Sequence, residues 1–192
     1  MKQIALKNKG KIIDYALVDD EDYDWLINYN WRYCRDTYDR DIRNTAYARS
    51  TPNSNGKAFR MHRLILERHG ILDSHQKLVD HIDGDGLNNQ KTNLRLVSNS
   101  QNCMNRTKPF GKYSSKYKGV CYEKEFKKWR CRIKKDGEIK FLQRFESEFD
   151  AAAAYDLMSQ KIFGEYAKLN FDFLDKSTIL KVEKLLKPYD TK

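Results

Sequence analysis

The stretch from Val79 to Val97, VDHIDGDGLNNQKTNLRLV, constrains the fold of this chain more than any other. An apolar run ends at Asp80 and His81, a loop rich in Gly, Asp and Asn follows, and a second apolar run begins at Asn93. Two short apolar runs around a loop whose glycines permit positive φ predict a hairpin. It is either an ordinary hairpin with a polar loop, or one whose two sides assemble a metal site.

A helix is expected directly after this hairpin. Ser98 followed by Gln101 fits a capping box, which places Asn102 about one turn into the helix. The predicted order is therefore strand, loop, strand, helix, with Asp80 and His81 on the first strand.

The loop residues have a plainer interpretation. Asp83 and Asp85, each followed by Gly, lack the spaced acids and terminal Glu of a calcium loop, so we interpret them as turn formers. Asn88 and Asn89 are interpreted as loop amides that bond backbone groups. An Asp-His pair arises easily by chance, so only the whole set of residues favours catalysis.

The histidines outside this hairpin also have an ordinary interpretation. A histidine beside apolar residues on a helix is more often a packing or surface residue than a ligand, and we assign His69 and His75 to that class. His62, in the stretch MHRLILERHG, stays open between the two roles.

The segment VDHIDGDGLNNQKTNLRLVSNSQNCMNR, with the upstream MHRLIL, resembles the HNH endonuclease motif in its phage and group I intron homing-endonuclease form. The resemblance implies a hairpin and a helix that grip one divalent metal ion, Mg²⁺ or Mn²⁺. It implies Asp80 and Asn102 as metal ligands and His81 as the general base. Asn93 would orient the His81 ring. Zinc-stapled variants of the family use cysteine pairs that this chain lacks, so no structural zinc is expected.

The chemistry of phosphodiester hydrolysis matches these roles. A neutral imidazole with a pKa of about 6.5 can take a proton from water at cellular pH. An amide oxygen that accepts from its second N–H can hold the ring in one tautomer. One carboxylate and one amide oxygen form an incomplete shell for a hard cation, which leaves positions open for the phosphate and the leaving oxygen.

The cysteines and the apolar runs indicate the compartment. Cys34, Cys103, Cys121 and Cys131 form no CxxC pair, which argues against a thiolate zinc site and a disulfide framework. No apolar run approaches the ~20 residues that span a membrane, and the N-terminus MKQIALKNKGK has no signal-peptide core. We expect a cytoplasmic monomer, in a bacterial or phage-infected cell, with no membrane partner.

Positive charge concentrates in the C-terminal half. Between Lys112 and Arg144, twelve Lys/Arg and four acids supply +8 of the net charge of +10. Strands are expected at YKGVCYEK, KWRCRIKK and EIKFLQRF, with the hairpin turn Asp136-Gly137 between the last two. Basic and apolar residues alternate in the middle strand, and the helix SEFDAAAAYDLMSQKIFG would cover the apolar face. A basic sheet face for a polyanion is predicted, against the alternative of a merely solvated face.

The stretches YKGV, KWRCRI, FESEFDAAAAYD and AKLNF resemble the Apetala-two/ethylene-response-factor (ERF) domain of plants, which also occurs appended to HNH homing endonucleases. In that family the three-stranded sheet lies in the major groove of double-stranded DNA. The resemblance implies a set of DNA contacts: Lys118, Tyr122, Arg130, Arg132, Lys134, Phe141 and Arg144. Simple alternation, however, places Phe141 on the core side in line with Ile139.

We therefore expect an α+β protein in which a ββα-metal module precedes a three-stranded antiparallel sheet packed on one helix. The expected segments are residues 1–77 as an N-terminal mixed α/β support, 78–106 as the HNH motif, 107–116 as a basic linker, 117–171 as the Apetala-two/ERF-like domain, and 172–192 as a tail with a short helix.

The predicted function is a site-directed DNA endonuclease, of the phage or intron homing type, that uses one divalent metal ion and a histidine general base. The alternative is a non-catalytic, sequence-specific DNA-binding regulator with a degenerate HNH module. A weaker third possibility is an RNA-binding protein, which competition between duplex DNA and RNA would test.

Overall fold

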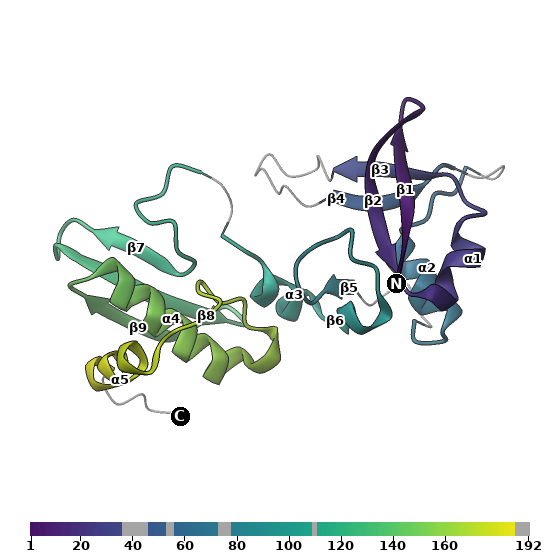
Figure 1. The fold of residues 1–192 in the computed structure, drawn as a ribbon. Coiled ribbons are helices and arrows are strands. Elements are labelled where there is room, and N and C mark those ends of the chain that lie inside the picture. Colours follow the sequence, from purple (N-terminus) through teal and green to yellow (C-terminus); the bar gives the residue numbers. More distant parts are fainter. Residues whose placement is uncertain (36–45, 53–55, 73–77, 109–110, 187–192) are drawn as a thin grey trace. The chain divides into compact units, whose positions relative to one another are not determined.

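The computed structural model describes residues 1–35, 46–52, 56–72, 78–108 and 111–186, and it divides into two compact units (Figure 1). The units are Met1–Asn99 and Ser100–Lys192, and each combines strands and helices around its own core. This agrees with the α+β class. The expected end of the nuclease motif was residue 106, whereas contacts group almost all of the helix α3 (Asn99–Asn105) with the second unit. No helix among the described residues has both the length and the apolar character needed to cross a membrane.

The first unit is built on a four-stranded sheet with the strand order β2-β1-β3-β4. β1 runs parallel to β3, and the outer pairs are antiparallel. Its elements are β1 (Lys2–Asn8), β2 (Lys11–Val18), α1 (Asp20–Leu26), β3 (Trp31–Arg35), β4 (Ala46–Ser50), α2 (Met61–Arg68), β5 (Leu78–His81), the 3-10 turn η1 (Lys91–Asn93) and β6 (Leu94–Val97). The core of the unit contains Ile4, Leu6, Ala16, Val18, Leu26, Trp31, Ala48, Met61, Ile65, Leu66, Leu72 and Leu94.

β5 and β6 form the predicted antiparallel hairpin, and its loop is bound to the larger sheet. The N–H of Leu17 donates to the carbonyl of Leu87 at 2.9 Å, and the N–H of Asn89 donates to the carbonyl of Leu17 at 2.8 Å. Gly86 lies so close to β4 that an added Cβ would stand 2.3 Å from the carbonyl oxygen of Ala46. Only glycine permits this approach, so Gly86 allows the loop to pack directly against β4.

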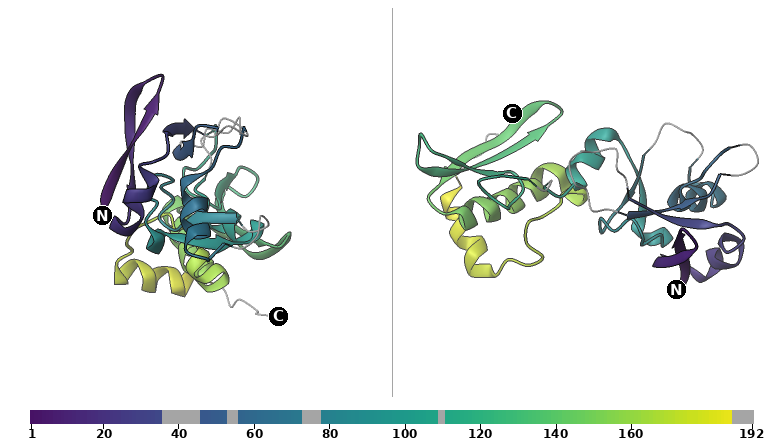
Figure 2. Two further views of the ribbon diagram at one scale, coloured as in Figure 1. Left: turned by 90° about the vertical axis from the view of Figure 1, so that its right-hand side faces the viewer. Right: turned by 90° about the horizontal axis from the view of Figure 1, so that it is seen from above.

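The second unit is a three-stranded antiparallel sheet, in the order β7-β8-β9, with α4 across one face (Figures 1 and 2). Its elements after α3 are β7 (Val120–Glu123), β8 (Lys128–Lys135), β9 (Glu138–Phe145), α4 (Glu148–Phe163), the 3-10 turn η2 (Gly164–Tyr166) and α5 (Lys176–Leu185). Ser147 caps α4 as expected, because its side chain accepts from the N–H of Asp150 at 3.4 Å. The alanine run of α4 is fully buried, and α5 is the short helix expected in the tail.

The predicted alternation holds along β8. Cys131 and Ile133 are buried, whereas Arg132 and Lys134 are exposed. On β9 the alternation is interrupted, since the pairing register shifts opposite Ile133 and Lys134. Phe141 faces the core, as simple alternation predicts, whereas Ile139 is 51% exposed rather than in line with it. The bulge is the physical reason for this departure from the simple period-two pattern.

Candidate active site and DNA-contact surface

Asp80 and His81 end β5, and both are buried, at 8% and 5% exposure. Successive residues of a strand point to opposite faces, so the two side chains leave β5 in different directions. Asp80 pairs across the hairpin with Arg95, whose Nε and Nη2 donate to Oδ2 of Asp80 at 3.1 and 3.0 Å. Charge-assisted hydrogen bonds of this kind are short and strong. Arg95 therefore fixes the orientation of the carboxylate.

The His81 ring is enclosed by polar and aromatic groups. Its Nε2 lies 3.5 Å from Oδ1 of Asn89. The His62 ring is perpendicular to it at a centroid distance of 5.0 Å, and the Tyr47 ring lies at 5.9 Å. Burial lowers the pKa of His81, although the Asn89 hydrogen bond and the nearby aspartates act to raise it. The ring is therefore neutral at neutral pH, as a general base must be.

Asn93 was expected to orient His81, but its side chain bonds the hairpin loop. Its Oδ1 accepts from the N–H of Asp83 at 3.1 Å, and its Nδ2 donates to Oδ1 of Asp83 and to the carbonyl of Asn88 at 3.0 and 2.8 Å. Despite partial burial, the hydrogen bonds that Asp83 receives lower its pKa and keep it ionised. In this structure Asn93 braces the loop, and the amide beside His81 belongs to Asn89.

Asn89 was interpreted from the sequence as a loop amide that serves backbone groups, and that interpretation is incomplete. Its Nδ2 does donate to the carbonyl of Leu87 at 3.0 Å, but its Oδ1 faces His81. The side chain is completely buried. Nothing in the sequence separates Asn89 from Asn88, because both are amides of one polar loop.

Residues around α1 hold the start of η1. The carboxylate of Asp19 accepts from the N–H of Lys91 at 2.8 Å and from Nε2 of Gln90 at 3.2 Å. Nζ of Lys91 also donates to Glu21 at 2.6 Å. The acidic stretch near the N-terminus therefore serves the loop that precedes β6.

Asn102, the second expected metal ligand, lies on α3 and is partly exposed within the second unit. Two contacts fix α3 there. Oγ of Ser100 donates to Oδ1 of Asp136 at 2.8 Å, and Nζ of Lys118 donates to the carbonyl of Met104. Met104 belongs to the core of the second unit. The role of Asn102 as a ligand stays a prediction.

Residues 59–104 match a family model described as HNH endonuclease. The matched range contains all four expected site residues, Asp80, His81, Asn93 and Asn102. This part of the chain is similar to HNH endonucleases.

A comparison with curated proteins gives a similar result. The chain is 37% identical over 92 residues to an uncharacterized HNH endonuclease of Acanthamoeba polyphaga mimivirus. The match covers 48% of this chain and 46% of the relative, so the chain spans about half the length of the curated protein it matches. No solved structure matches the chain.

The Asp80 carboxylate fits a hard divalent cation. Oriented by Arg95, it would supply an oxygen ligand, which Mg²⁺ and Mn²⁺ prefer. The described part of the chain has one other group of side chains that could bind a metal ion: Glu21, Asp22 and His69. Their ligand atoms lie within 4.8 Å of one another. His69 already hydrogen-bonds Asp22 there at 3.0 Å, as in an ordinary structural contact.

Four of the predicted DNA contacts share the face of the sheet opposite α4. Strand register places Arg130 beside Arg144 and puts Arg132 and Lys134 on the same side as these two. Glu123 accepts from Arg130 and Arg144 at 2.5 and 2.6 Å, and Arg132 and Lys134 are exposed. The pairs with Glu123 hold two guanidinium groups in place at one end of this basic face.

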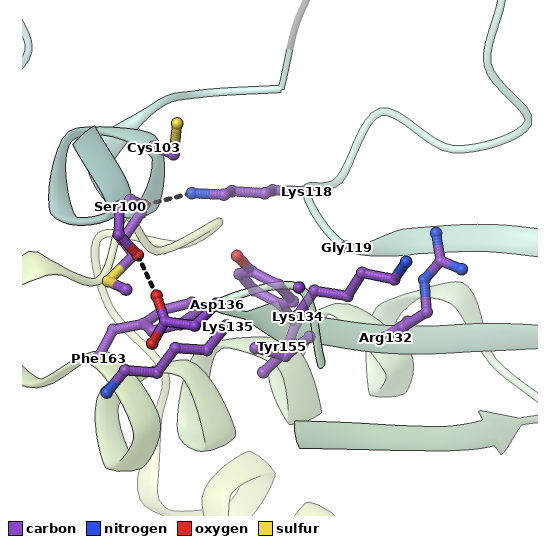
Figure 3. Close-up of a pocket in the computed structure, with 13 residues that line it drawn as sticks. Ser100, Cys103, Lys118, Gly119, Arg132, Lys134, Lys135, Asp136, Tyr155 and Phe163 are labelled. Atoms are coloured by element: carbon purple, nitrogen blue, oxygen red, sulfur yellow. Dashed lines mark hydrogen bonds between the residues drawn. The ribbon is translucent and has the colours of Figure 1, made fainter. Parts of the chain in front are cut away.

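Lys118 is half-buried, and its ammonium group bonds the backbone of α3. Burial lowers the pKa of Lys118 to about 8, and its Nζ donates to the carbonyl of Met104. Figure 3 shows it reaching toward α3 in a pocket of about 530 Å³ that Arg132 and Lys134 also line. A cation in this pocket would help to bind a phosphate.

Two of the expected DNA contacts lie away from this basic face, and their contact with DNA stays a prediction. Phe141 is only 5% exposed and belongs to the core, so it cannot touch DNA without unpacking the sheet from α4. Tyr122 pairs directly with Trp129 across the strands, at a ring distance of 5.0 Å. Opposed residues of antiparallel strands share a face, so Tyr122 lies on the side of Trp129 rather than beside Arg132.

Proposed function

We propose that the protein is a metal-dependent DNA endonuclease whose HNH module cuts the strand and whose C-terminal sheet binds the duplex. The observation that supports it best is the buried Asp80-His81 pair at the end of β5, within the region that matches the HNH family. A more specific form of the proposal is a homing endonuclease of the phage or intron type with an Apetala-two/ERF-like domain. The three-stranded sheet packed on one helix supports that form.

In the proposed reaction, neutral His81 takes the proton from the attacking water, and Asn89 steadies its ring. Asp80 and Asn102 would hold the divalent cation, which when bound supplies charge stabilisation to the phosphate and the leaving oxygen. Asn93 keeps the loop in shape through Asp83. Arg130, Arg132, Lys134 and Arg144 would contact the DNA, with Lys118 beside them.

The test is nicking of a supercoiled plasmid with Mg²⁺ or Mn²⁺, against the same reaction with a chelator. His81→Ala, purified identically, controls for contaminating nucleases and should cut ~10²–10⁴-fold more slowly, the usual worth of general acid–base catalysis. Asp80→Ala should abolish cleavage and leave DNA binding largely intact, because affinity comes mainly from backbone and groove contacts elsewhere. Equal cleavage by wild type and His81→Ala would refute the assignment.

One observation favours a second candidate, a DNA-binding regulator that does not cut. Arg95 occupies Oδ2 of Asp80, and a guanidinium there competes with a metal ion for the carboxylate. A regulator would bind duplex DNA and leave the plasmid supercoiled at every metal concentration. An endonuclease with Arg95 as an orienting residue would nick it.

A further inference from the structure

His62 lies against the proposed general base although the proposed mechanism gives it no role. It occupies the first turn of α2 and is only 3% exposed. Its ring stands perpendicular to the His81 ring, with 5.0 Å between centroids and 90° between planes. Tyr47 contacts both rings at 5.9 Å. The three rings thus form one cluster at the end of β5.

The buried position of His62 lowers the stability of the fold. Within the described part of the chain, its Nδ1 is buried and has no hydrogen-bond partner. A buried polar atom left unsatisfied destabilises the fold, whereas an apolar aromatic ring would fill the same place without that penalty. Burial, His81 and the cations Arg60 and Arg63 lower the pKa of His62 well below its usual value, so its ring is uncharged.

The His81 ring must be held in one orientation to act as a general base. Its contact with Asn89 is long, at 3.5 Å between the two atoms, and such a contact orients weakly. Perpendicular aromatic pairs have a preferred geometry of their own, so packing against the His62 ring adds to the restraint of the His81 ring.

We propose that His62 is a positioning residue for DNA cleavage, which holds the His81 imidazole through their perpendicular ring contact. The inference rests on the proposed endonuclease function. A general base displaced by about 1 Å can lose ~10²-fold in rate. Loss of the His62 ring should therefore slow the chemical step without weakening the binding of DNA, which the other unit is proposed to supply.

The experiment compares His62→Leu with His62→Phe in the full-length protein. Leucine fills the site but has no flat edge, whereas phenylalanine keeps the ring contact. We expect His62→Leu to lower kcat by ~10–100-fold with KM for DNA almost unchanged, and His62→Phe to recover most of that loss. His62→Phe should also melt at a higher temperature than the wild type, because it removes the unsatisfied Nδ1.

A readout independent of cleavage is the NMR signal of the His81 ring protons. In His62→Leu these signals should shift and broaden, because the ring current of His62 is gone and the ring is less restrained, whereas in His62→Phe they should stay sharp. If His62→Leu does not fold, His62→Met takes its place, since its unbranched chain adapts to irregular sites.

The outcomes separate the inference from the function on which it rests. A wild-type protein that cuts no DNA refutes the endonuclease. A wild-type protein that cuts, with His62→Leu equally fast, refutes only the positioning role. Two further results also overturn that role: a His62→Phe protein as slow as His62→Leu, and a His62→Leu protein whose loss lies in KM.

Discussion

Replacing Gly119 by alanine tests how the second unit is packed beneath its basic face. Gly119 precedes β7 and has φ +75°, where L side chains are strained. A Cβ built there would stand 2.1 and 2.2 Å from two ring carbons of Tyr155, a core residue on α4. The backbone cannot swing away freely, because the carbonyl of Gly119 accepts from the N–H of Arg132 at 2.9 Å.

The expected loss of stability follows from these two effects. The left-handed backbone costs alanine about 1–2 kcal/mol. Forcing a methyl group into a packed ring costs about 1–3 kcal/mol more, because Tyr155 must leave its rotamer or the sheet must shift. Gly119→Ala should therefore destabilise the second unit by about 2–5 kcal/mol. It should also weaken DNA binding, since Lys118 and Arg132 line the same pocket as Gly119.

Gly137→Ala is the matched control in the same sheet. Gly137 also has positive φ, at +84°, but no atom lies within 4 Å of an added Cβ. The free energy of unfolding of Gly137→Ala should fall only by the cost of the left-handed backbone, about 1–2 kcal/mol. The assay is amide hydrogen exchange of β8, which reports the opening free energy of this sheet separately from the first unit. Equal losses in the two variants would refute the argument, because they would show that the Tyr155 ring yields without cost.

Three further predictions concern the charged groups. The cleavage rate should rise with pH and level off below the ordinary histidine pKa of about 6.5, because burial lowers the pKa of His81; a flat profile from acid to neutral pH at saturating metal and DNA would point to another base. The free energy of unfolding of the first unit should fall as pH drops below about 6.5, because His62 stays neutral in the fold while the unfolded chain takes up the proton. Hydrogen exchange at pH 5 and 7 measures this loss of stability, and His62→Phe should reduce the loss. Arg132→Ala and Lys134→Ala should each flatten the slope of log affinity against log salt by about 0.9 if they contact phosphates, whereas Lys184→Ala, on α5 in the same unit, should not.

Features with local causes could be predicted from the sequence. The alternation in β8 and the turn at Asp136-Gly137 depend on neighbouring residues, and both occur as expected. The strand that ends in Asp80 and His81 could also be predicted, because an apolar run ends in a polar pair before a glycine-rich loop. These signals need no knowledge of the rest of the fold.

The partners of side chains could not be predicted in the same way. The amide beside His81 belongs to Asn89 and not to Asn93, because the loop is shaped by its contacts with β2 and β4. His62 reaches His81 from a different helix. Ile139 is turned out of the core by one bulge in the strand pairing. Each outcome depends on residues distant in sequence, which no local pattern encodes.

The same contacts show why the HNH hairpin depends on residues that precede it. A two-stranded hairpin is at best marginally stable alone in water, and β5 and β6 have only four residues each. Their loop bonds the backbone of Leu17, its end is held by Asp19, and Gly86 lies against β4. The strands β2 and β4 and the residue Asp19 are thus part of the structure that holds His81 in place. The orientation of His81, the proposed general base, is therefore set by the N-terminal sheet as much as by the motif that contains it.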